Sequence, residues 1–547
     1  MKIIIVGGYG TFGGRLVDLL SDEQRLTIYV AGRNLQKAEE FCNSKIADAI
    51  LVPLCLDRSQ PEDVLEHVKP DLVVDASGPF QIYGDHPYRF VEACLAVKVN
   101  YIDLADGSDF VAGISVFDQK AKEANCYAIS GMSSFPVLTA AVVRKLAVGL
   151  KFIDEIQAGI APSPFAGVGL NVIKAIASYS GKPVPILKDG KWQTGFGFFD
   201  SKRMVVNVPG YMPLHPIRFA LTDVPDNKIL SWDWPEVKSI WMGAGPTPAL
   251  LHRLLWLAAG LVRLRVLRSL LPLTPIMNWV INTLRWGEHR GGMIVQVKGK
   301  GETRSWHLLA EGDGGPLVPS MAAEAIIRNC LDGRPPKIGA RSGHGELELA
   351  DYAPSLAKHG IIYGFRSEVD GTLYQRVMGD ALSRLDTPLK NFHQQKQSFS
   401  MEGQADILPS SNILGRVIAG IMRFPLAGEK VPLTVEIEIA AKGETWTRGF
   451  AGRKFSSRQK FGQGRYEGLL VESFGPLNFG MAVTETLGKL GLVLRGWDIL
   501  GLPLPTFLMP HAIANEHGKD GRFNFDVEIR APIVGRIVRY QGWLAEP

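Results

Sequence analysis

The stretch that decides the fold at the start of the chain is Met1-Lys-Ile-Ile-Ile-Val-Gly-Gly-Tyr-Gly-Thr-Phe-Gly-Gly-Arg15. Ile3 to Val6 form an apolar run typical of a buried parallel strand, and Leu16 to Leu20 continue as a helix. The glycines between them fit the pattern G-x-G-x-x-G, with Gly8, Gly10 and Gly13. A strand, a glycine turn and a helix in this order predict a dinucleotide-binding site. The alternative is an ordinary glycine-rich turn.

Each glycine has a physical role in this interpretation. We expect Gly8 to allow the tight turn, Gly10 to let a pyrophosphate approach the backbone, and Gly13 to let the helix pack on the strand. The N-terminus of the helix offers free N–H groups and the positive end of its dipole to phosphates. The predicted contacts at this loop are Gly8, Tyr9, Gly10, Thr11, Phe12 and Gly13.

The end of the second expected strand, 26–31, indicates which dinucleotide is bound. An Asp or Glu usually holds the ribose 2′-hydroxyl of NAD at this point, but here the chain reads Ala31-Gly32-Arg33-Asn34. Arg33 can pair with a 2′-phosphate, and Lys37 adds positive charge one turn later. We therefore predict NADP, with contacts from Arg33, Asn34 and Lys37. A solvated surface arginine is the alternative for Arg33.

Later strand ends extend this predicted cofactor site. Asp57 follows the strand 50–56 and is either an adenine contact or a turn aspartate. Ser77, Gly78 and Pro79 follow the strand 71–76 and are expected beside the nicotinamide half. Further strands at 100–104 and 126–129 alternate with helices, which predicts a doubly wound parallel sheet.

These residues carry a resemblance to a known family. The segments 7–13, 31–34, 77–80, 83–84, 101–104 and 131–136 are similar to the NADP-binding domain of the saccharopine dehydrogenase-like family. The resemblance implies a Rossmann domain at 1–140, an α/β (mixed-sheet) substrate and dimerisation domain at 141–365, and a homodimer. It also implies an oxidoreductase, since the family includes reductases that make or break a secondary amine. The chain is similar as well to lipid-associated oxidoreductases and trans-acting enoyl reductases.

Three residues near the expected cofactor loop are candidates for catalysis. His86 titrates in the useful range, and Tyr83 is a second proton donor. Asp103, at the next strand end together with Asp106, can bind an amino group or orient a base. The alternatives are a loop histidine bonded to backbone and a structural strand-end aspartate. No spacing of His, Cys, Asp or Glu predicts a metal site.

The segment 248–285 is unusually apolar and basic. On one continuous helix, Arg253, Arg263, Arg265 and Arg268 would cover about half of the circumference, with Leu, Val, Trp and Ala on the rest. This pattern fits a helix lying on an anionic membrane surface. We favour the alternative, which is a dimer interface or a lid over an apolar pocket with arginines at the rim.

The last part of the chain, 370–547, changes to short alternating strands, which predicts an antiparallel β-rich sheet or barrel. It resembles an uncharacterised domain often fused to saccharopine dehydrogenase-like domains. Such a barrel can hold an acyl chain, or its interior can be a packed scaffold core. The residues expected inside are Phe474, Leu477, Phe479, Met481, Leu492, Leu494, Trp497, Leu500, Leu502, Leu504 and Phe507.

Composition limits the function classes. A net charge of +5 over 547 residues and the lack of an aromatic-rich basic patch argue against nucleic-acid binding. The five cysteines are scattered singly, and the chain opens directly on a strand, so we expect a cytoplasmic location. The leading hypothesis is an NADP-dependent oxidoreductase that transfers a hydride to or from a C=N, C=C or C=O bond of an amino-acid-like or lipid-like substrate. The alternative is a catalytically silent, NADP-bound sensor or scaffold with a peripheral membrane contact through 248–285.

Overall fold

The computed structural model describes residues 1–367, 371–532 and 534–546. The chain forms two compact units. The N-terminal unit contains residues 1–204 and 217–363, and the barrel unit contains residues 205–216 and 364–547. The predicted ends of the third domain, residues 370 and 547, lie outside the described residues.

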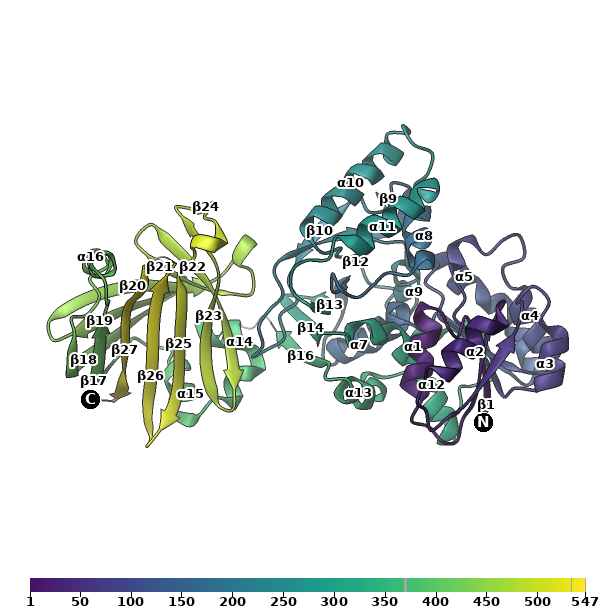
Figure 1. Ribbon diagram of the computed structural model, residues 1–547, viewed down its shortest axis with the longest axis horizontal. Helices are drawn as coiled ribbons and strands as arrows, with labels where there is room; N and C mark the ends of the chain where they lie inside the picture. Colours follow the sequence, from purple (N-terminus) through teal and green to yellow (C-terminus); the bar gives the residue numbers. More distant parts are fainter. Residues whose placement is uncertain (368–370, 533, 547) are drawn as a thin grey trace. The chain divides into compact units, whose positions relative to one another are not determined.

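A seven-stranded sheet organises the first part of the N-terminal unit (Figure 1). Its order is β3-β2-β1-β4-β5-β6-β15, and every pairing is parallel. This is the doubly wound order expected from the sequence, and it reverses between β1 and β4. The strands are β1 (Lys2–Val6), β2 (Thr27–Gly32), β3 (Ile50–Cys55), β4 (Leu72–Asp75), β5 (Asn100–Asp103), β6 (Tyr127–Ser130) and β15 (Gly339–Ser342).

Helices between these strands cover the sheet. β1 leads into α1 (Thr11–Leu20), which buries Leu16, Val17, Leu19 and Leu20. The other helices of this part are α2 (Leu35–Asn43), α3 (Glu62–Val68), α4 (Arg89–Ala96), α5 (Ser108–Gly113), α6 (Asp118–Ala124) and α7 (Thr139–Ala147). The central strands β1 and β4 are almost wholly apolar because they are buried on both faces.

A second, mixed sheet follows with the order β10-β11-β12-β7-β13-β14-β16. β7 pairs parallel with β12 and antiparallel with β13, so the expected mixed α/β sheet is confirmed. Its strands are β7 (Ile153–Ala161), β10 (Ser201–Met204), β11 (Ile217–Leu221), β12 (Ser239–Ala244), β13 (Arg290–Gly299), β14 (Glu302–Glu311) and β16 (Ile362–Ser367). The helices here are α8 (Leu170–Tyr179), α9 (Asp226–Asp233), α12 (Val318–Leu331) and α13 (Leu349–Lys358).

The apolar basic segment 248–285 does not form one continuous helix. α10 (Ala249–Arg263) and α11 (Thr274–Thr283) are separated by a bend. Arg265 adopts φ +61°, and the Val266 N–H donates to the Leu261 carbonyl at 2.9 Å, which is the Schellman geometry that ends a helix. The predicted arginine face is therefore wrong: Arg265 and Arg268 lie beyond the helix. No helix of the described residues is long and apolar enough to cross a membrane.

One face of α10 is buried and the other is exposed. Leu251, Leu255 and Ala259 pack against Phe198 and partly buried side chains of α8 and α11. The exposed large apolar side chains of this segment are Leu250, Leu254, Trp256, Leu257, Leu261, Leu264, Val266, Ile276 and Trp279. The helical pair is thus anchored to its own unit and still presents an unusually apolar surface.

The barrel unit contains a closed antiparallel barrel, as expected for the last part of the chain (Figure 1). The sheet runs β22-β21-β20-β19-β18-β17-β27-β26-β25-β23, and β22 also pairs with β23, which closes the ring. The strands are β17 (Phe399–Pro409), β18 (Gly428–Ala440), β19 (Gly443–Phe450), β20 (Arg453–Phe461), β21 (Leu470–Phe474), β22 (Leu477–Thr486), β23 (Lys489–Ile499), β25 (His511–Lys519), β26 (Arg522–Ala531) and β27 (Gly535–Ala545).

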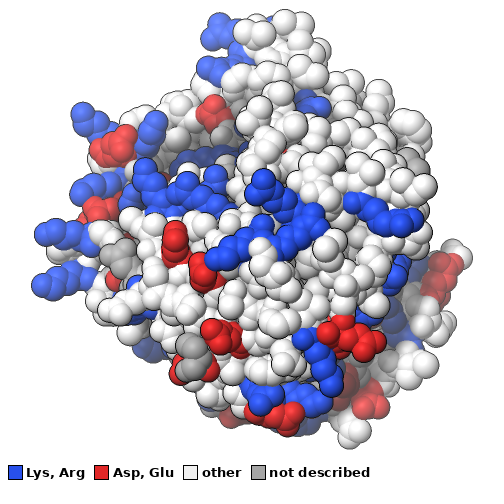
Figure 2. Space-filling model, turned by 90° about the vertical axis from the view of Figure 1, so that its left-hand side faces the viewer, with Lys and Arg blue, Asp and Glu red and all other residues white. Residues whose placement is uncertain are grey.

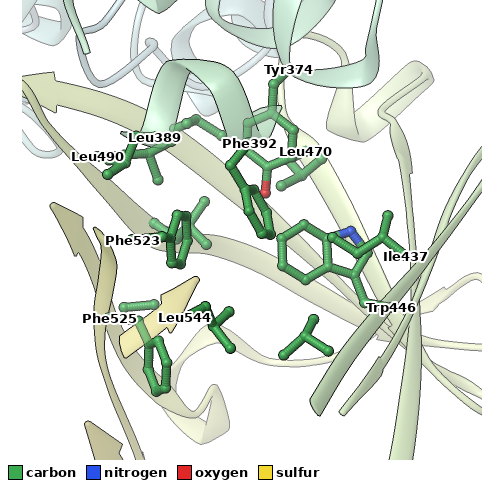
Figure 3. Packing of buried hydrophobic residues seen from close by; sticks show 14 of the residues in the cluster. Tyr374, Leu389, Phe392, Ile437, Trp446, Leu470, Leu490, Phe523, Phe525 and Leu544 are labelled. Carbon is green, nitrogen blue, oxygen red and sulfur yellow. The ribbon is translucent and has the colours of Figure 1, made fainter. Parts of the chain in front are cut away.

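Alternation along these strands separates an apolar interior from a charged exterior. β20 shows it clearly, since Phe455, Ser457 and Gln459 are buried and the residues between them are exposed. Figure 2 shows that Lys, Arg, Asp and Glu side chains are spread over the face of the molecule it presents. Figure 3 shows part of the buried cluster, in which Phe392 lies between Phe523 and Trp446.

The two ends of the barrel are built differently. α14 (Leu373–Met378) and α15 (Thr387–His393) pack against the cluster of Figure 3 at one end. The other end carries α16 (Ile413–Ile421), between β17 and β18, and the short strand β24 (Leu502–Pro503), after β23. We call this second end the rim.

The expected interior of the barrel is corrected at its last residues. Leu500, Leu502 and Phe507 were expected inside the barrel, but they are 81%, 69% and 75% exposed because β23 ends at Ile499 and the prolines that follow break the alternation. Trp497 and Leu504 are partly buried outside the main cavity. Ser320 lies within the first turn of α12, and its hydroxyl donates to the Phe12 carbonyl at 3.0 Å.

Candidate dinucleotide site

The glycine loop after β1 is packed against its own backbone. Gly7 has φ +76°, so the left-handed residue of the turn is Gly7 rather than Gly8. A Cβ on Gly8 would lie 2.8 Å from the Ile5 carbonyl oxygen, and one on Gly13 would lie 2.3 Å from the Gly7 carbonyl oxygen. Gly10 donates its N–H to the same Gly7 oxygen at 2.8 Å. The loop has no room for side chains at these positions, which is the form a pyrophosphate cradle requires.

The first turn of α1 faces this cradle. No side chain of the described residues caps it, so the N–H groups of Thr11, Phe12 and Gly13 are available to an anion. Tyr9 leans over Gly32 at the end of β2, and its hydroxyl accepts the Asn34 N–H at 3.1 Å. Tyr9 thus closes the adenosine side of the predicted site.

The residues expected to select NADP lie between β2 and α2. Arg33 and Lys37 are exposed. Asn34 caps α2 through its side-chain oxygen, which accepts the Lys37 N–H at 3.0 Å. The Asp57 carboxylate accepts hydrogen bonds from the Ser59 N–H at 2.9 Å and from the Ser59 hydroxyl at 2.7 Å, and these bonds lower the pKa of Asp57. Asp57 thus forms a turn with Ser59, and its contact with adenine stays a prediction.

Arg58 is a site residue that sequence reasoning missed. Its guanidinium carbon lies 3.3 Å from the centre of the Tyr83 ring. Burial lowers its pKa, while the nearby Asp75 carboxylate opposes that shift. Arg58 therefore places positive charge beside the loop that follows β4.

Tyr83 and Ser77 are held by Asp75, which is fully buried at the end of β4. The Tyr83 hydroxyl donates to one oxygen of Asp75, and the Ser77 hydroxyl donates to the other at 2.6 Å. Burial raises the pKa of Asp75, and the hydrogen bonds from the Ser77 hydroxyl and N–H oppose the rise. Tyr83 thus connects the 77–83 loop to the sheet. Its hydroxyl proton is already donated to Asp75.

Asp103 is the neighbour of Asp75 on β5 and is also fully buried. One oxygen accepts the Ser130 hydroxyl and the N–H groups of Gly131 and Ala105, at 2.8 to 3.0 Å. Burial raises its pKa to about 7 in spite of these bonds. Its geometry fixes the loops after β5 and β6 and does not expose a carboxylate to a substrate.

His86 lies on the exposed surface of the loop before α4. Among the described residues, none forms a hydrogen bond with its imidazole. The structure therefore leaves the ring free to turn, and it does not bring His86 together with Tyr83 or Asp103.

Ser77, Gly78 and Pro79 lie at the switch point of the sheet, and α8 covers them. The Asn171 amide donates to the Gly78 carbonyl at 2.8 Å. Gly169 lies against the Thr11 hydroxyl, because a Cβ added to Gly169 would lie 2.2 Å from that oxygen. Arg15 reaches the Ala166 carbonyl at 3.3 Å, and burial lowers its pKa. Segment 166–171 thus lies directly over the glycine loop.

Acidic side chains gather beyond this covering segment. Gln81 donates to Asp106 at 3.0 Å, and Ser108 donates to Asp223 at 2.6 Å. Burial raises the pKa of both carboxyl groups, the nearby Asp223 raises the pKa of Asp106 further, and Asp109 raises that of Asp223. Tyr179 of α8 lies close enough to Asp106 and Asp223 for both to raise its pKa further. Clustered groups with shifted pKa values beside a switch point are typical of a reaction site.

The parallel sheet and the loop together form a Rossmann-like fold whose glycine loop is typical of dinucleotide-binding domains. Residues 3–132 match the family model of the saccharopine dehydrogenase NADP-binding domain, and residues 385–544 match a domain of unknown function, DUF4166. The family resemblance stated from the sequence is confirmed for these two segments. No curated protein matches the chain.

Solved structures match part of the chain at low similarity. A dehydrogenase, MviM, from Clostridium difficile is 11% identical with a TM-score of 0.31, and the match covers 65% of this chain and 98% of that one. A protein from Thermotoga maritima described as a probable dehydrogenase is 10% identical with a TM-score of 0.32, and the match covers 62% of this chain and 91% of that one. The WlbA dehydrogenase from Thermus thermophilus, in complex with NAD and α-ketoglutarate, is 10% identical with a TM-score of 0.29, covering 62% and 90%.

Proposed function

We propose that the N-terminal unit is an NADP-dependent oxidoreductase. The observation that carries the proposal is the cradle formed by Gly7, Gly8, Gly10 and Gly13 at the uncapped start of α1, at the switch point of a doubly wound sheet. This arrangement fits a dinucleotide pyrophosphate. Arg33 and Lys37, with no carboxylate at the end of β2, favour a 2′-phosphate over a free hydroxyl.

The bound nucleotide supplies a hydride, and the chain must hold the acceptor and handle one proton. Asp106, with Gln81 and Tyr179 beside it, is placed better for this role than Asp103, which is closed off by backbone contacts. Burial raises the pKa of Asp106, which shifts the carboxyl group toward the protonated form that can donate a proton. The proposed reaction remains hydride transfer to or from a C=N, C=C or C=O bond. The substrate classes are amino-acid-like and lipid-like molecules.

The cofactor test compares NADPH and NADH affinity in the wild type and in Arg33→Ala. We expect the wild type to prefer NADPH and Arg33→Ala to lose about 1.5–3 kcal/mol of NADPH binding, the usual size of a charge-assisted contact. NADH binding should change little. Equal wild-type affinities for the two nucleotides would refute the NADP assignment.

A second candidate function is favoured by the exposed apolar surface of α10 and α11. In this proposal the chain is a catalytically silent, NADP-bound protein that attaches to anionic lipid through 248–285. Trp279 is 67% exposed, and Arg265 and Arg268 are exposed near it in sequence. Flotation with phosphatidylglycerol vesicles tests this proposal. The triple variant Trp279→Asp, Arg265→Glu and Arg268→Glu should no longer float with the vesicles. The control Ile46→Asp, at an exposed apolar residue outside this segment, should float as the wild type does. Unchanged flotation of the triple variant would remove the membrane role, and a change in oligomeric state would indicate a homodimer interface.

A further inference from the structure

The barrel is not a filled scaffold core, because it encloses a cavity of about 210 Å³. Its lining is mainly Phe, Leu, Val, Ile and Met side chains, among them Phe525, Leu492 and Val527. Two positions on the inner face of β25 are alanines, Ala512 and Ala514, where larger side chains would occupy this space. A cavity of about 150 Å³ that is lined only by Leu, Ile and Phe stays dry and binds an apolar molecule, and most of this lining is of that kind. The interior therefore favours an apolar ligand.

The inner part of the cavity is polar, but its groups already bond to one another. Arg448 donates to Ser457 at 2.9 Å and to Glu472 at 3.2 Å. His393 and Glu516 form a second pair at 2.7 Å. The register puts Glu472 opposite Gln459, which accepts the hydroxyl of Tyr374 from α14. These groups thus lie toward the end that α14 and α15 close.

This polar part is unfavourable for an anionic head group. Glu472 and Glu516 both line the cavity, and Arg448, the cation beside them, is already engaged by Glu472. A carboxylate or phosphate placed there would meet two carboxylates of its own sign. An amphiphile can therefore enter only with its alkyl chain inward and its head group at the rim.

The rim itself is apolar on both sides of α16. Ile418 and Met422 face the cavity, while Ile413 and Ile421 are each 75% exposed. The helix is fixed in place, since Asn412 caps its start and Phe424 N–H closes its end on the Ala419 carbonyl at 2.9 Å. α16 is therefore apolar both on the face toward the cavity and on the outer face. A helix that is apolar on all sides is normally buried against protein or lipid.

The second rim segment, 499–513, has the same character. Leu500 and Phe507 are largely exposed, and Pro510 and Ala512 at its end line the cavity. Neither 410–428 nor 499–513 contains an Asp or Glu, and the first contains Arg416 and Arg423. An apolar surface with arginines, no acids and a direct connection to an apolar cavity matches an anionic bilayer better than a protein partner.

We propose that the barrel binds one long alkyl chain of an amphiphilic lipid, which enters chain-first from a bilayer on which α16 and the 499–513 segment dock. The cavity supplies the binding site, α16 and 499–513 supply the contact with the lipid surface, and Arg416 and Arg423 lie at head-group level. The proposal does not rest on the oxidoreductase activity of the N-terminal unit.

Binding to the cavity is tested with the full-length protein and cis-parinarate, a fluorescent unbranched fatty acid. We expect saturable binding of one molecule per chain, displaced by oleate. Ala512→Trp, which fills the cavity near its mouth, should weaken binding by at least about tenfold. Asn515→Trp on the same strand points outward and is the matched control, which should bind as the wild type does. Wild-type affinity in Ala512→Trp, or no binding by the wild type, would overturn the cavity site.

Docking is tested by the rate at which the protein takes cis-parinarate from vesicles of phosphatidylcholine and phosphatidylglycerol in equal amounts. Ile413→Asp with Ile421→Asp should slow this transfer by at least about tenfold while leaving the affinity for free cis-parinarate unchanged. Leu487→Asp is the matched control, because Leu487 is 90% exposed on a turn at the opposite end of the barrel. Unchanged transfer in the rim variant would overturn the membrane contact. If the rim variant turns a dimer into a monomer while the rate of transfer stays unchanged, the rim would instead be the surface that joins two copies of this chain.

Discussion

The substitution that tests the glycine cradle most directly is Gly13→Ala, with Gly14→Ala as its matched control. Both glycines lie in α1, so each alanine gains about 1 kcal/mol of helix propensity. A Cβ at Gly13 would lie 2.3 Å from the Gly7 oxygen and 2.8 Å from the Gly7 carbon, and both are rigid backbone atoms. A Cβ at Gly14 would lie 3.3 Å from the edge of the Phe41 ring, which can turn away.

These distances predict different effects on nucleotide binding. Ordinary contact begins near 3.4 Å, so the Gly7 turn must move by about 1 Å in Gly13→Ala. Overpacking of this kind costs about 1–3 kcal/mol, which helix propensity partly offsets, so we expect the stability of the unit to fall by at most about 2 kcal/mol. NADPH affinity should fall much more clearly, because losing a single charge-assisted hydrogen bond to the pyrophosphate costs about 1.5–3 kcal/mol, tenfold or more in Kd.

The assay is a titration of intrinsic NADPH fluorescence on the two variants and the wild type, with circular dichroism to confirm that each is folded. Gly14→Ala should bind NADPH as the wild type does and be equally or slightly more stable. The reasoning is refuted if both variants lose affinity equally, or if a folded Gly13→Ala binds NADPH with wild-type affinity.

Three further predictions concern the N-terminal unit. Burial raises the pKa of Asp226 to about 8 from an ordinary value near 4, so the unit should lose stability as pH rises from about 4 to 8. Asp226→Asn should remove this loss, so the difference in unfolding temperature between the variant and the wild type should grow with pH. A difference that does not grow with pH would contradict the prediction. With a substrate identified, Asp106→Asn should reduce kcat by about 100-fold or more while His86→Gln keeps near-wild-type turnover, and the reverse order would restore His86 as the proton donor. Arg265→Gly should raise the melting temperature by an amount equivalent to about 0.5–1 kcal/mol, since Arg265 occupies a left-handed position that glycine adopts freely; a destabilised variant would argue against the Schellman ending of α10.

The parallel sheet could be predicted strand by strand from the sequence, because its strands are short apolar runs closed by turn residues. β15 could not, since Gly339-Ala-Arg-Ser342 has no apolar pattern and pairs with β6 more than two hundred residues earlier in the chain. The end of α10 was missed for a related reason. A Schellman turn is normally signalled by glycine, and here Arg265 takes that conformation.

At the candidate site, the glycine loop and the strand ends were predictable because their spacing is local. The hydrogen bonds that each side chain forms could not be predicted. Tyr83 and Asp103 carry reactive groups in a suitable place, but their hydrogen bonds to Asp75, Ser130 and Gly131 depend on strands that meet only in the folded sheet. The position of Arg58 on the Tyr83 ring has no sequence signal, because an arginine after a strand is usually a surface residue.

The barrel cavity has an energetic consequence that separates a ligand site from a scaffold. A void of about 210 Å³ costs on the order of 5 kcal/mol at about 24 cal/mol per Å³, which is comparable with the whole stability of a small domain. Larger side chains at Ala512 and Ala514 would recover part of that energy in a pure scaffold. An alkyl chain recovers it only while bound, so the stability of the barrel unit should rise with ligand concentration. We therefore expect oleate to raise the unfolding temperature of the wild type but not of Ala512→Trp, and an equal rise in both proteins would refute the cavity as the site of binding.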